Sequence, residues 1–161
     1  MSDTPHQVDV HGTPEQIWAF LWDADALGRV LPGCESISAL GQGVYQAKLA
    51  VKVPFFTVHG DVRAELHEPD PPRSVVLTLD GTTRGLNGSL RVRLPMALEA
   101  VESSEDPVTR IRYGVEVEVA GALTAFGPRP IRDALVGEVK GLAANIEREI
   151  RAGRIPGMTT P

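Results

Sequence analysis

Residues able to carry acid–base or nucleophilic chemistry are few in this sequence, and they are scattered along it. His59 and His67 have the outward parity of the alternating segments that contain them. His6 and His11 stand near the start of the chain, without a partner at a metal-ligand spacing. General acid–base catalysis requires a titratable side chain inside the pocket. The sequence therefore predicts no catalytic residue and no metal site.

Cys34 is the single cysteine, which excludes an internal disulfide and a cysteine-built zinc or iron–sulfur site. A cysteine close to a helix end can be a nucleophile with a lowered pKa. Because no histidine lies near Cys34 in the sequence, a small buried hydrophobic side chain is the favoured interpretation. The glycine-rich run 81–88 lacks the Gly-Lys-Ser/Thr ending of a phosphate-binding loop and is interpreted as a hairpin connection. No cofactor is expected.

The composition indicates one globular domain. Of the 161 residues, 42% are hydrophobic and 23% are charged, and the net charge is −5. Nucleic-acid-binding domains usually carry a basic surplus, so no nucleic acid is expected as a partner. We expect a single domain over residues 1–152 and a flexible tail over 153–161. The longest apolar run, Ile17–Trp22, is too short to span a membrane, and the N-terminal residues lack a signal-peptide pattern, which predicts a cytoplasmic protein.

Local patterns near the N-terminus predict a strand and two short helices. Alternation around Val8 and Val10 favours a strand. The run 13–16, Thr-Pro-Glu-Gln, has the pattern of a capping box with proline at the first helical position. A second short helix, about Asp25–Leu31, must end at Pro32–Gly33 because proline cannot continue it.

Between Glu35 and Ala120, apolar and polar residues alternate with a period of two, in runs separated by short turns. Such alternation is typical of an antiparallel sheet with one face in solvent. A long amphipathic helix begins at Pro128 or Pro130 and ends near Gly153. The expected fold is α+β, with a curved seven-stranded antiparallel sheet around the long C-terminal helix and two short helices between strands 1 and 2. This is the helix-grip arrangement.

The inward parity of the strands is apolar, and its only polar side chains are those of Tyr45 and Tyr113. An apolar cavity with few polar groups is typical of a site for a hydrophobic ligand. Gly137 and Gly141 lie inside the final helix, where glycine costs about 1 kcal/mol relative to alanine. Close helix–sheet packing and room for a ligand both stay open as explanations. The predicted ligand-binding residues are Tyr45, Ala47, Leu49, Gly60, Val62, Ala64, Leu77, Val92, Met96, Tyr113, Val115, Leu135, Val139 and Leu142.

The connections at the two ends of the predicted sheet differ in character. Successive hairpins place alternate connections at opposite ends. One end collects polar and acidic connections, and the other collects aromatic and apolar ones whose only charges are arginines. We predict a pocket mouth or docking patch at the second end, with inward folding of these side chains to close the barrel as the alternative. The residues of this predicted mouth are Phe55, Phe56, Arg84, Leu86, Leu123, Phe126 and Arg129.

Several motifs, in this order of elements, resemble a known family. They are Leu31-Pro32-Gly33-Cys34-Glu35, the strand from Tyr45, Asp70-Pro71-Pro72, Gly85–Gly88, and Gly121 with Leu123. Over about residues 5–150 the chain resembles the CoxG family of carbon monoxide dehydrogenase subunits, in the START/Bet v 1-like (SRPBCC) superfamily. The resemblance implies a carrier of hydrophobic ligands, linked to quinone handling and assembly for a molybdenum-containing carbon monoxide dehydrogenase.

The expected function is therefore that of a carrier for a quinone-like or lipid-like molecule rather than an enzyme. Its expected partners are that small molecule and a molybdenum-containing dehydrogenase, with peripheral contact at the inner face of the membrane. Two alternatives stay open. One is an enzyme of the polyketide cyclase or aromatase kind on the same fold, which needs inward acids or bases. The other is an assembly module whose pocket is filled by its own side chains.

Overall fold

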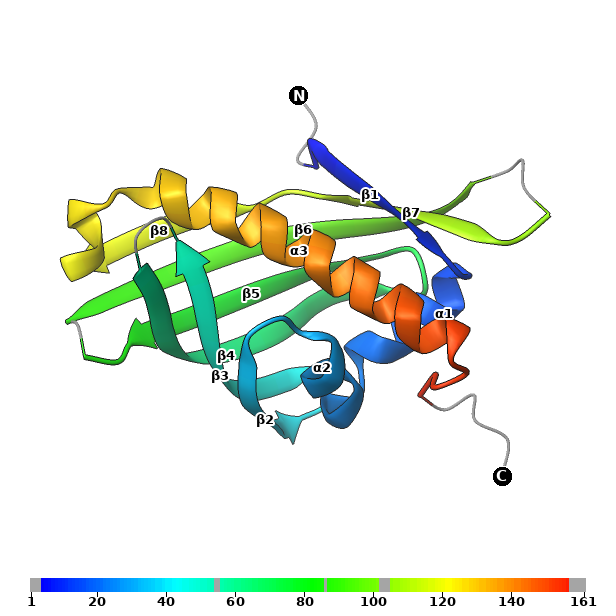
Figure 1. The fold of residues 1–161 in the computed structure, drawn as a ribbon, viewed down its shortest axis with the longest axis horizontal. Coiled ribbons are helices and arrows are strands. Elements are labelled where there is room, and N and C mark those ends of the chain that lie inside the picture. The colour runs from blue at the N-terminus through cyan, green and yellow to red at the C-terminus, as the bar shows by residue number, and fades with distance from the viewer. Residues whose placement is uncertain (1–3, 54–55, 86, 102–104, 157–161) are drawn as a thin grey trace.

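A long helix, α3, crosses the concave face of a curved antiparallel sheet (Figure 1). The structure is a computed structural model and describes residues 4–53, 56–85, 87–101 and 105–156; of Phe56 it describes the backbone alone. In those residues the elements are β1 (His6–His11), α1 (Pro14–Leu21), α2 (Ala24–Val30), β2 (Cys34–Gly41), β3 (Val44–Val53), β4 (Phe56–Asp70), β5 (Ser74–Thr83), β6 (Gly88–Val101), β7 (Val108–Tyr113), β8 (Glu116–Gly121), the 3-10 helix η1 (Ala122–Ala125) and α3 (Pro128–Arg151).

The sheet has the strand order β1-β7-β6-β5-β4-β3-β2, and β8 pairs with β6. Every pairing among these strands is antiparallel. The two short helices follow β1 and lie under the C-terminal half of α3 (Figure 1). This topology confirms the expected α+β helix-grip architecture. The sequence could predict it because the alternation of side chains assigns one face of each strand to the interior.

The last expected strand is divided in two, so the sheet has eight strands in the described residues instead of seven. β7 and β8 keep one register against β6, since the pairs Met96–Tyr113 and Arg93–Glu116 are separated by three residues on both strands. Pro95 lies between them on β6. It accepts a hydrogen bond from the opposite strand at 3.1 Å but has no N–H to return one. The proline interrupts the ladder without changing which side chains face inward.

Side-chain hydrogen bonds cap the N-termini of the two short helices and set where each helix begins. Thr13 Oγ1 accepts a hydrogen bond from the Gln16 N–H at 3.1 Å, and Gln16 Oε1 accepts one from the Thr13 N–H at 2.9 Å, which confirms the capping box. The second helix begins earlier than expected, because Asp23 caps it by accepting from the N–H of Ala26. The corner after α2 is tied to β3 by the N–H of Ala50, which donates to the Gly33 carbonyl at 2.8 Å.

The helix α3 buries Ile131, Val139, Ala143 and Ile146 against the sheet and the short helices. These apolar side chains recur at the spacing that predicted a long amphipathic helix. The segment that follows α3 also packs against the core. Ile155, which we expected in a flexible tail from residue 153, is buried in the core.

Candidate functional site

An apolar cavity of about 120 Å³ lies between α3, the sheet and the corner that joins α2 to β2. The strands supply aliphatic side chains that point to the concave face, and α3 closes the cavity from above. The corner contributes Leu31 and Pro32, and the two short helices contribute Leu21 and Leu27. A closed apolar wall of this kind favours a hydrophobic ligand.

Most of the residues predicted from strand parity lie around this one cavity. The predicted residues that line it are Tyr45, Ala47, Leu49, Val62, Ala64, Leu77, Met96, Leu135, Val139 and Leu142. The other four do not. Gly60 lines a neighbouring hollow, and Val92, Tyr113 and Val115 are packed in the core. Inward parity is shared by a whole strand, whereas the cavity occupies only part of the strand's length.

A smaller apolar hollow of about 40 Å³ continues the cavity toward the tips of β3 and β4. The two share Leu49, Val62 and Leu135 as lining residues. The smaller one reaches Val53 and Ile131, near the N-terminal half of α3 (Figure 1). The apolar space thus runs along α3 toward the end of the sheet where we predicted a mouth.

Glu138 also lines the cavity, and the sequence analysis missed it. By helical spacing Glu138 falls with Asp133 and Lys140 on the polar side of the last helix. The prediction of inward polar side chains covered the strands alone, and α3 adds this acid to the lining. Burial raises the pKa of the Glu138 carboxyl, and the positive charge of Lys52 acts in the opposite direction. Its position one residue before the inward Val139 is the signal in the sequence that could have found it.

The two tyrosine hydroxyls are both engaged. Tyr45 donates a hydrogen bond to the Leu21 carbonyl at 2.7 Å, and Tyr113 donates to the Val136 carbonyl at 3.2 Å. Burial raises the pKa of both hydroxyls, so they stay protonated and act as donors near neutral pH. They join the short helix α1 and the long helix α3 to the sheet.

The two glycines of α3 differ in their surroundings. A Cβ on Gly141 would lie 3.1 Å from Pro32 Cγ, so this glycine lets the helix approach the corner after α2 closely. A Cβ on Gly137 would meet no atom within 4 Å. Close packing therefore explains Gly141, and neither glycine provides empty space under the helix.

The family model of CoxG, a carbon monoxide dehydrogenase subunit, matches residues 7–151. The chain belongs to this family. Among curated proteins, none matches the sequence.

Solved structures that resemble this CoxG-family chain share its fold. A conserved protein from Geobacillus kaustophilus has a TM-score of 0.77 at 23% identity, covering 91% of this chain and 93% of its own. Ara h 8.0201 has a TM-score of 0.59 at 17% identity, with 91% and 95% covered. The Zhui aromatase/cyclase from Streptomyces sp. R1128 has a TM-score of 0.54 at 19% identity, with 92% and 94% covered. At identities of 17–23%, these likenesses show a shared fold.

The predicted mouth is only partly visible in this CoxG-family chain. Leu123 is 0% exposed, so it belongs to the core and its assignment to the mouth is wrong. Arg84 forms ion pairs with Glu35 and, at 3.8 Å, with Asp61, so its charge is already matched on the surface. These pairs leave Arg84 with less charge to offer an anionic partner than the sequence indicated.

Other mouth residues remain candidates or lie outside the described part. Phe126 is 45% exposed, and Arg129, just inside the N-terminus of α3, is exposed too. The residues Phe55 and Leu86 and the side chain of Phe56 lie outside the described residues. Among the described side chains of the predicted mouth, Phe126 and Arg129 therefore remain the candidates for a docking role.

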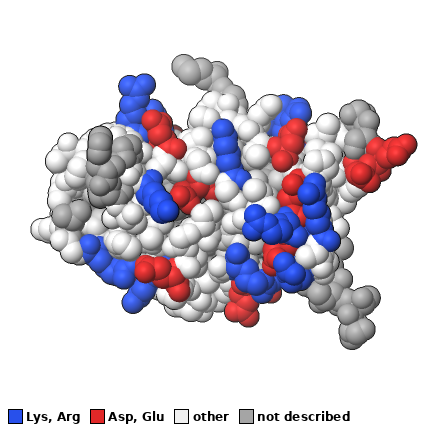
Figure 2. Space-filling model, in the orientation of Figure 1, with Lys and Arg blue, Asp and Glu red and all other residues white. Residues whose placement is uncertain are grey.

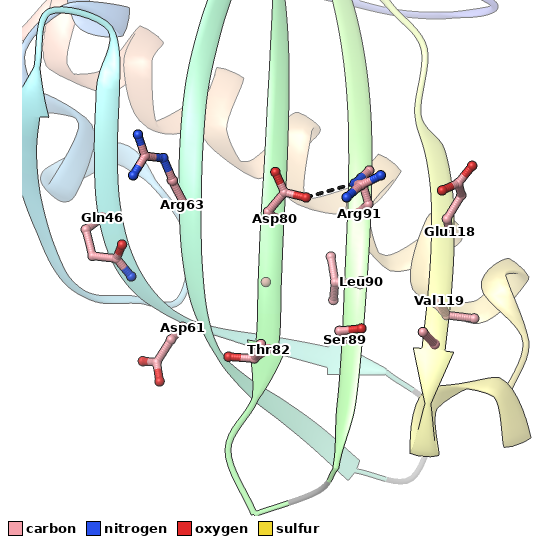
Figure 3. A pocket seen from close by; sticks show the side chains of 12 residues that line it. Gln46, Asp61, Arg63, Asp80, Thr82, Ser89, Leu90, Arg91, Glu118 and Val119 are labelled. Atoms are coloured by element: carbon pink, nitrogen blue, oxygen red, sulfur yellow. Dashed lines mark hydrogen bonds and ion pairs between the residues drawn. The ribbon is translucent and has the colours of Figure 1, made fainter.

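A hollow of about 540 Å³, larger than the apolar cavity, lies on the other face of the sheet of this CoxG-family chain (Figure 3). Its lining mixes apolar with charged residues, and two of its arginines are paired: Arg91 Nε donates to Asp80 at 2.9 Å, and Arg63 Nε donates to Glu65 at 3.1 Å. Asp61 and Glu118 also line this hollow, which is open to solvent on the outer face. We take the apolar cavity under α3 as the candidate site, because its lining is almost entirely apolar.

Metal and thiol chemistry have little support in the residues that the structure describes. They contain no group of three or more His, Cys, Asp or Glu side chains that could hold a metal ion. Burial raises the pKa of the Cys34 thiol, which disfavours the reactive thiolate and supports the interpretation as a small hydrophobic residue. Within the same residues, none of the helices is long and apolar enough to cross a membrane.

Proposed function

We propose that this CoxG-family protein is a carrier that binds a hydrophobic small molecule in the cavity under α3. The observation that supports the proposal is the apolar space of about 120 Å³ with its continuation of about 40 Å³ along the helix. Burial of apolar ligand surface contributes roughly 25 cal/mol per Å². The family and the fold both support ligand binding in this place.

The ligand in this proposal is quinone-like or lipid-like, and the protein serves a molybdenum-containing dehydrogenase as an accessory subunit. The family's name supports this partner. The exposed Phe126 and Arg129 would make the peripheral contact, at the membrane surface, through which such a ligand enters. The carrier works in the cytoplasm and at the inner face of the membrane.

The test combines retention and binding. Native mass spectrometry after mild purification is expected to show an apolar molecule that leaves on denaturation. Titration with the neutral fluorophore N-phenyl-1-naphthylamine is expected to saturate. The variant Ala64→Leu, which fills the cavity, should weaken binding by about tenfold, whereas Ala120→Leu on the outer face should not change it. Equal binding by all three proteins contradicts the proposed site.

A cyclase-like enzyme is the second candidate, and Glu138 is the observation that favours it. A carboxyl with a raised pKa in an apolar pocket is suited to proton transfer. One solved relative in fold is an aromatase/cyclase. Turnover of a poly-β-ketone substrate that is lost in Glu138→Gln would support this candidate over the carrier. We expect no such turnover, since no second acid or base lines the cavity among the described residues.

A further inference from the structure

Glu138 is the one acidic side chain among the described residues that line the cavity. Its neighbours in the lining include the aliphatic Leu135 and Val139 on the same helix and Val51 on β3. Glu138 is half-buried, and no described residue donates a hydrogen bond to its carboxyl group. Glu138 thus brings an acceptor without a protein donor to an otherwise apolar lining.

The partial burial of this carboxyl group has a cost. Loss of water disfavours its charged form and raises the pKa of Glu138, and an apolar side chain at this position would avoid that cost. The only other described lining residue with a titratable group, Tyr45, already uses its hydroxyl on the Leu21 carbonyl. Glu138 is therefore the polar group that the cavity offers to a bound molecule.

We propose that Glu138 is the polar anchor of the cavity and accepts a hydrogen bond from a hydroxyl group on the hydrophobic ligand. This inference rests on the proposed carrier function and names the ligand's head group. It selects an alcohol, a phenol or the reduced, quinol form of a quinone-like ligand.

The surroundings of Glu138 favour a neutral donor over other head groups. An ionised carboxylate only accepts hydrogen bonds, so it pairs with a hydroxyl and repels the carbonyl oxygen of an oxidised quinone. Lys52 already supplies a positive charge that acts on Glu138. A protonated amine on the ligand would be attracted by the Glu138 carboxylate but repelled by the positive charge of Lys52, whereas a neutral hydroxyl meets no such repulsion.

The test uses three probes of nearly equal shape: 1-naphthol, 1-methoxynaphthalene and 1-naphthylmethylamine. Each displaces N-phenyl-1-naphthylamine from the protein in a fluorescence titration at neutral pH. We expect the wild-type protein to bind 1-naphthol about tenfold more tightly than 1-methoxynaphthalene, in line with one hydrogen bond to a charged group. In Glu138→Leu the two should bind equally, and in Glu138→Gln the preference should shrink.

Asp133→Asn is the matched control, because Asp133 is an exposed acid on the same helix and does not line the cavity. It removes the same charge and should keep the full preference for 1-naphthol. Circular dichroism and thermal unfolding of each variant verify that the binding values refer to folded protein.

The outcomes separate the anchor from the carrier. Equal binding of 1-naphthol and 1-methoxynaphthalene by the wild type, unchanged in Glu138→Leu, overturns the anchor and leaves the carrier. Tightest binding of 1-naphthylmethylamine, lost in Glu138→Leu, overturns the hydroxyl in favour of a cation. Failure of the wild type to bind the fluorophore or any probe overturns the carrier proposal, and the anchor with it.

Discussion

The two halves of α3 do different things. The C-terminal half is tied to its surroundings by polar contacts: Glu149 accepts hydrogen bonds from Arg29 and Arg154, and Asn145 Nδ2 donates to the Val30 carbonyl at 2.8 Å. Basic and acidic side chains are mixed over this half (Figure 2). The N-terminal half instead lies over apolar space, with Leu135 and Glu138 in the cavity lining.

The difference shows how one helix both holds the fold together and covers an apolar cavity. Contacts between α3, α2 and β1 are concentrated where Ile146 and Glu149 are buried, so that end holds the helix in place. The N-terminal half supplies Leu135, Glu138 and Val139 to the cavity lining, and Leu142 extends that lining into the C-terminal half. In the proposed carrier, a ligand would enter without breaking the polar contacts that position the helix.

The largest expected effect tests the packing contrast between the halves. Ile146 is 2% exposed in the core, so Ile146→Ala should lower the free energy of unfolding by about 2–5 kcal/mol. Leu135 borders the cavity and is only partly buried, so Leu135→Ala should cost less, about 1–2 kcal/mol. Urea unfolding of both variants measures this. Equal losses of unfolding free energy in the two variants would contradict the proposed difference in packing between the two halves of α3.

The next effect concerns the polar ties of the C-terminal half. Glu149 is 7% exposed and holds the guanidinium groups of Arg29 and Arg154, the first at 3.0 Å. Glu149→Gln should lower the unfolding free energy by about 1–3 kcal/mol, because the amide cannot replace a charged acceptor toward both arginines. Glu118→Gln, an exposed acid on β8, is the control and should change stability little.

A stabilising change is expected in the N-terminal half. Gly137 is exposed in the helix interior, and a Cβ there would meet no atom within 4 Å. Gly137→Ala should therefore raise the free energy of unfolding by about 1 kcal/mol. Affinity for N-phenyl-1-naphthylamine should stay the same. A loss of binding in this variant would show that the glycine serves the cavity after all.

The smallest effect is a pH dependence of opposite sign in the two halves. Hydrogen bonds from His11 hold the pKa of the Glu147 carboxyl below its usual value of 4.5, so its stabilisation is present above that pH and is lost as the pH falls. Burial raises the pKa of Glu138 above the same value, so its ionisation destabilises the fold at higher pH, and this penalty disappears on acidification.

The two glutamine variants separate these contributions. At pH 7 Glu147→Gln should be less stable than the wild type, and Glu138→Gln should be more stable, each by about 0.5 kcal/mol. Both differences should shrink as the pH falls below the usual carboxyl pKa of 4.5, that of Glu138 first because its pKa is raised and that of Glu147 later because its pKa is lowered. The measurement is the urea midpoint as a function of pH. A destabilising Glu138→Gln at pH 7 would mean that the protein itself provides a partner for this carboxyl.

The sequence by itself determined the strands and which of their faces is buried. Alternation is a local property, since successive side chains of a strand point to opposite faces, so Tyr45 and Ala47 could be assigned inward and Lys48 outward before the sheet was known. The capping box of Thr13 and the long apolar stripe of the last helix are local as well. Even Pro95, which divides the last strand, left this parity intact.

Only the tertiary structure decided where the cavity begins and ends. Helical spacing gives the direction of Glu138 around its axis but not how far the opposing wall reaches. In this fold the corner at Pro32 and the end of β3 extend the apolar wall to that flank of the helix. In the same way, Arg84 meets Glu35, 49 residues away in the chain, and Leu123 folds into the core. These outcomes depend on contacts between distant segments, which residue type and local spacing do not encode.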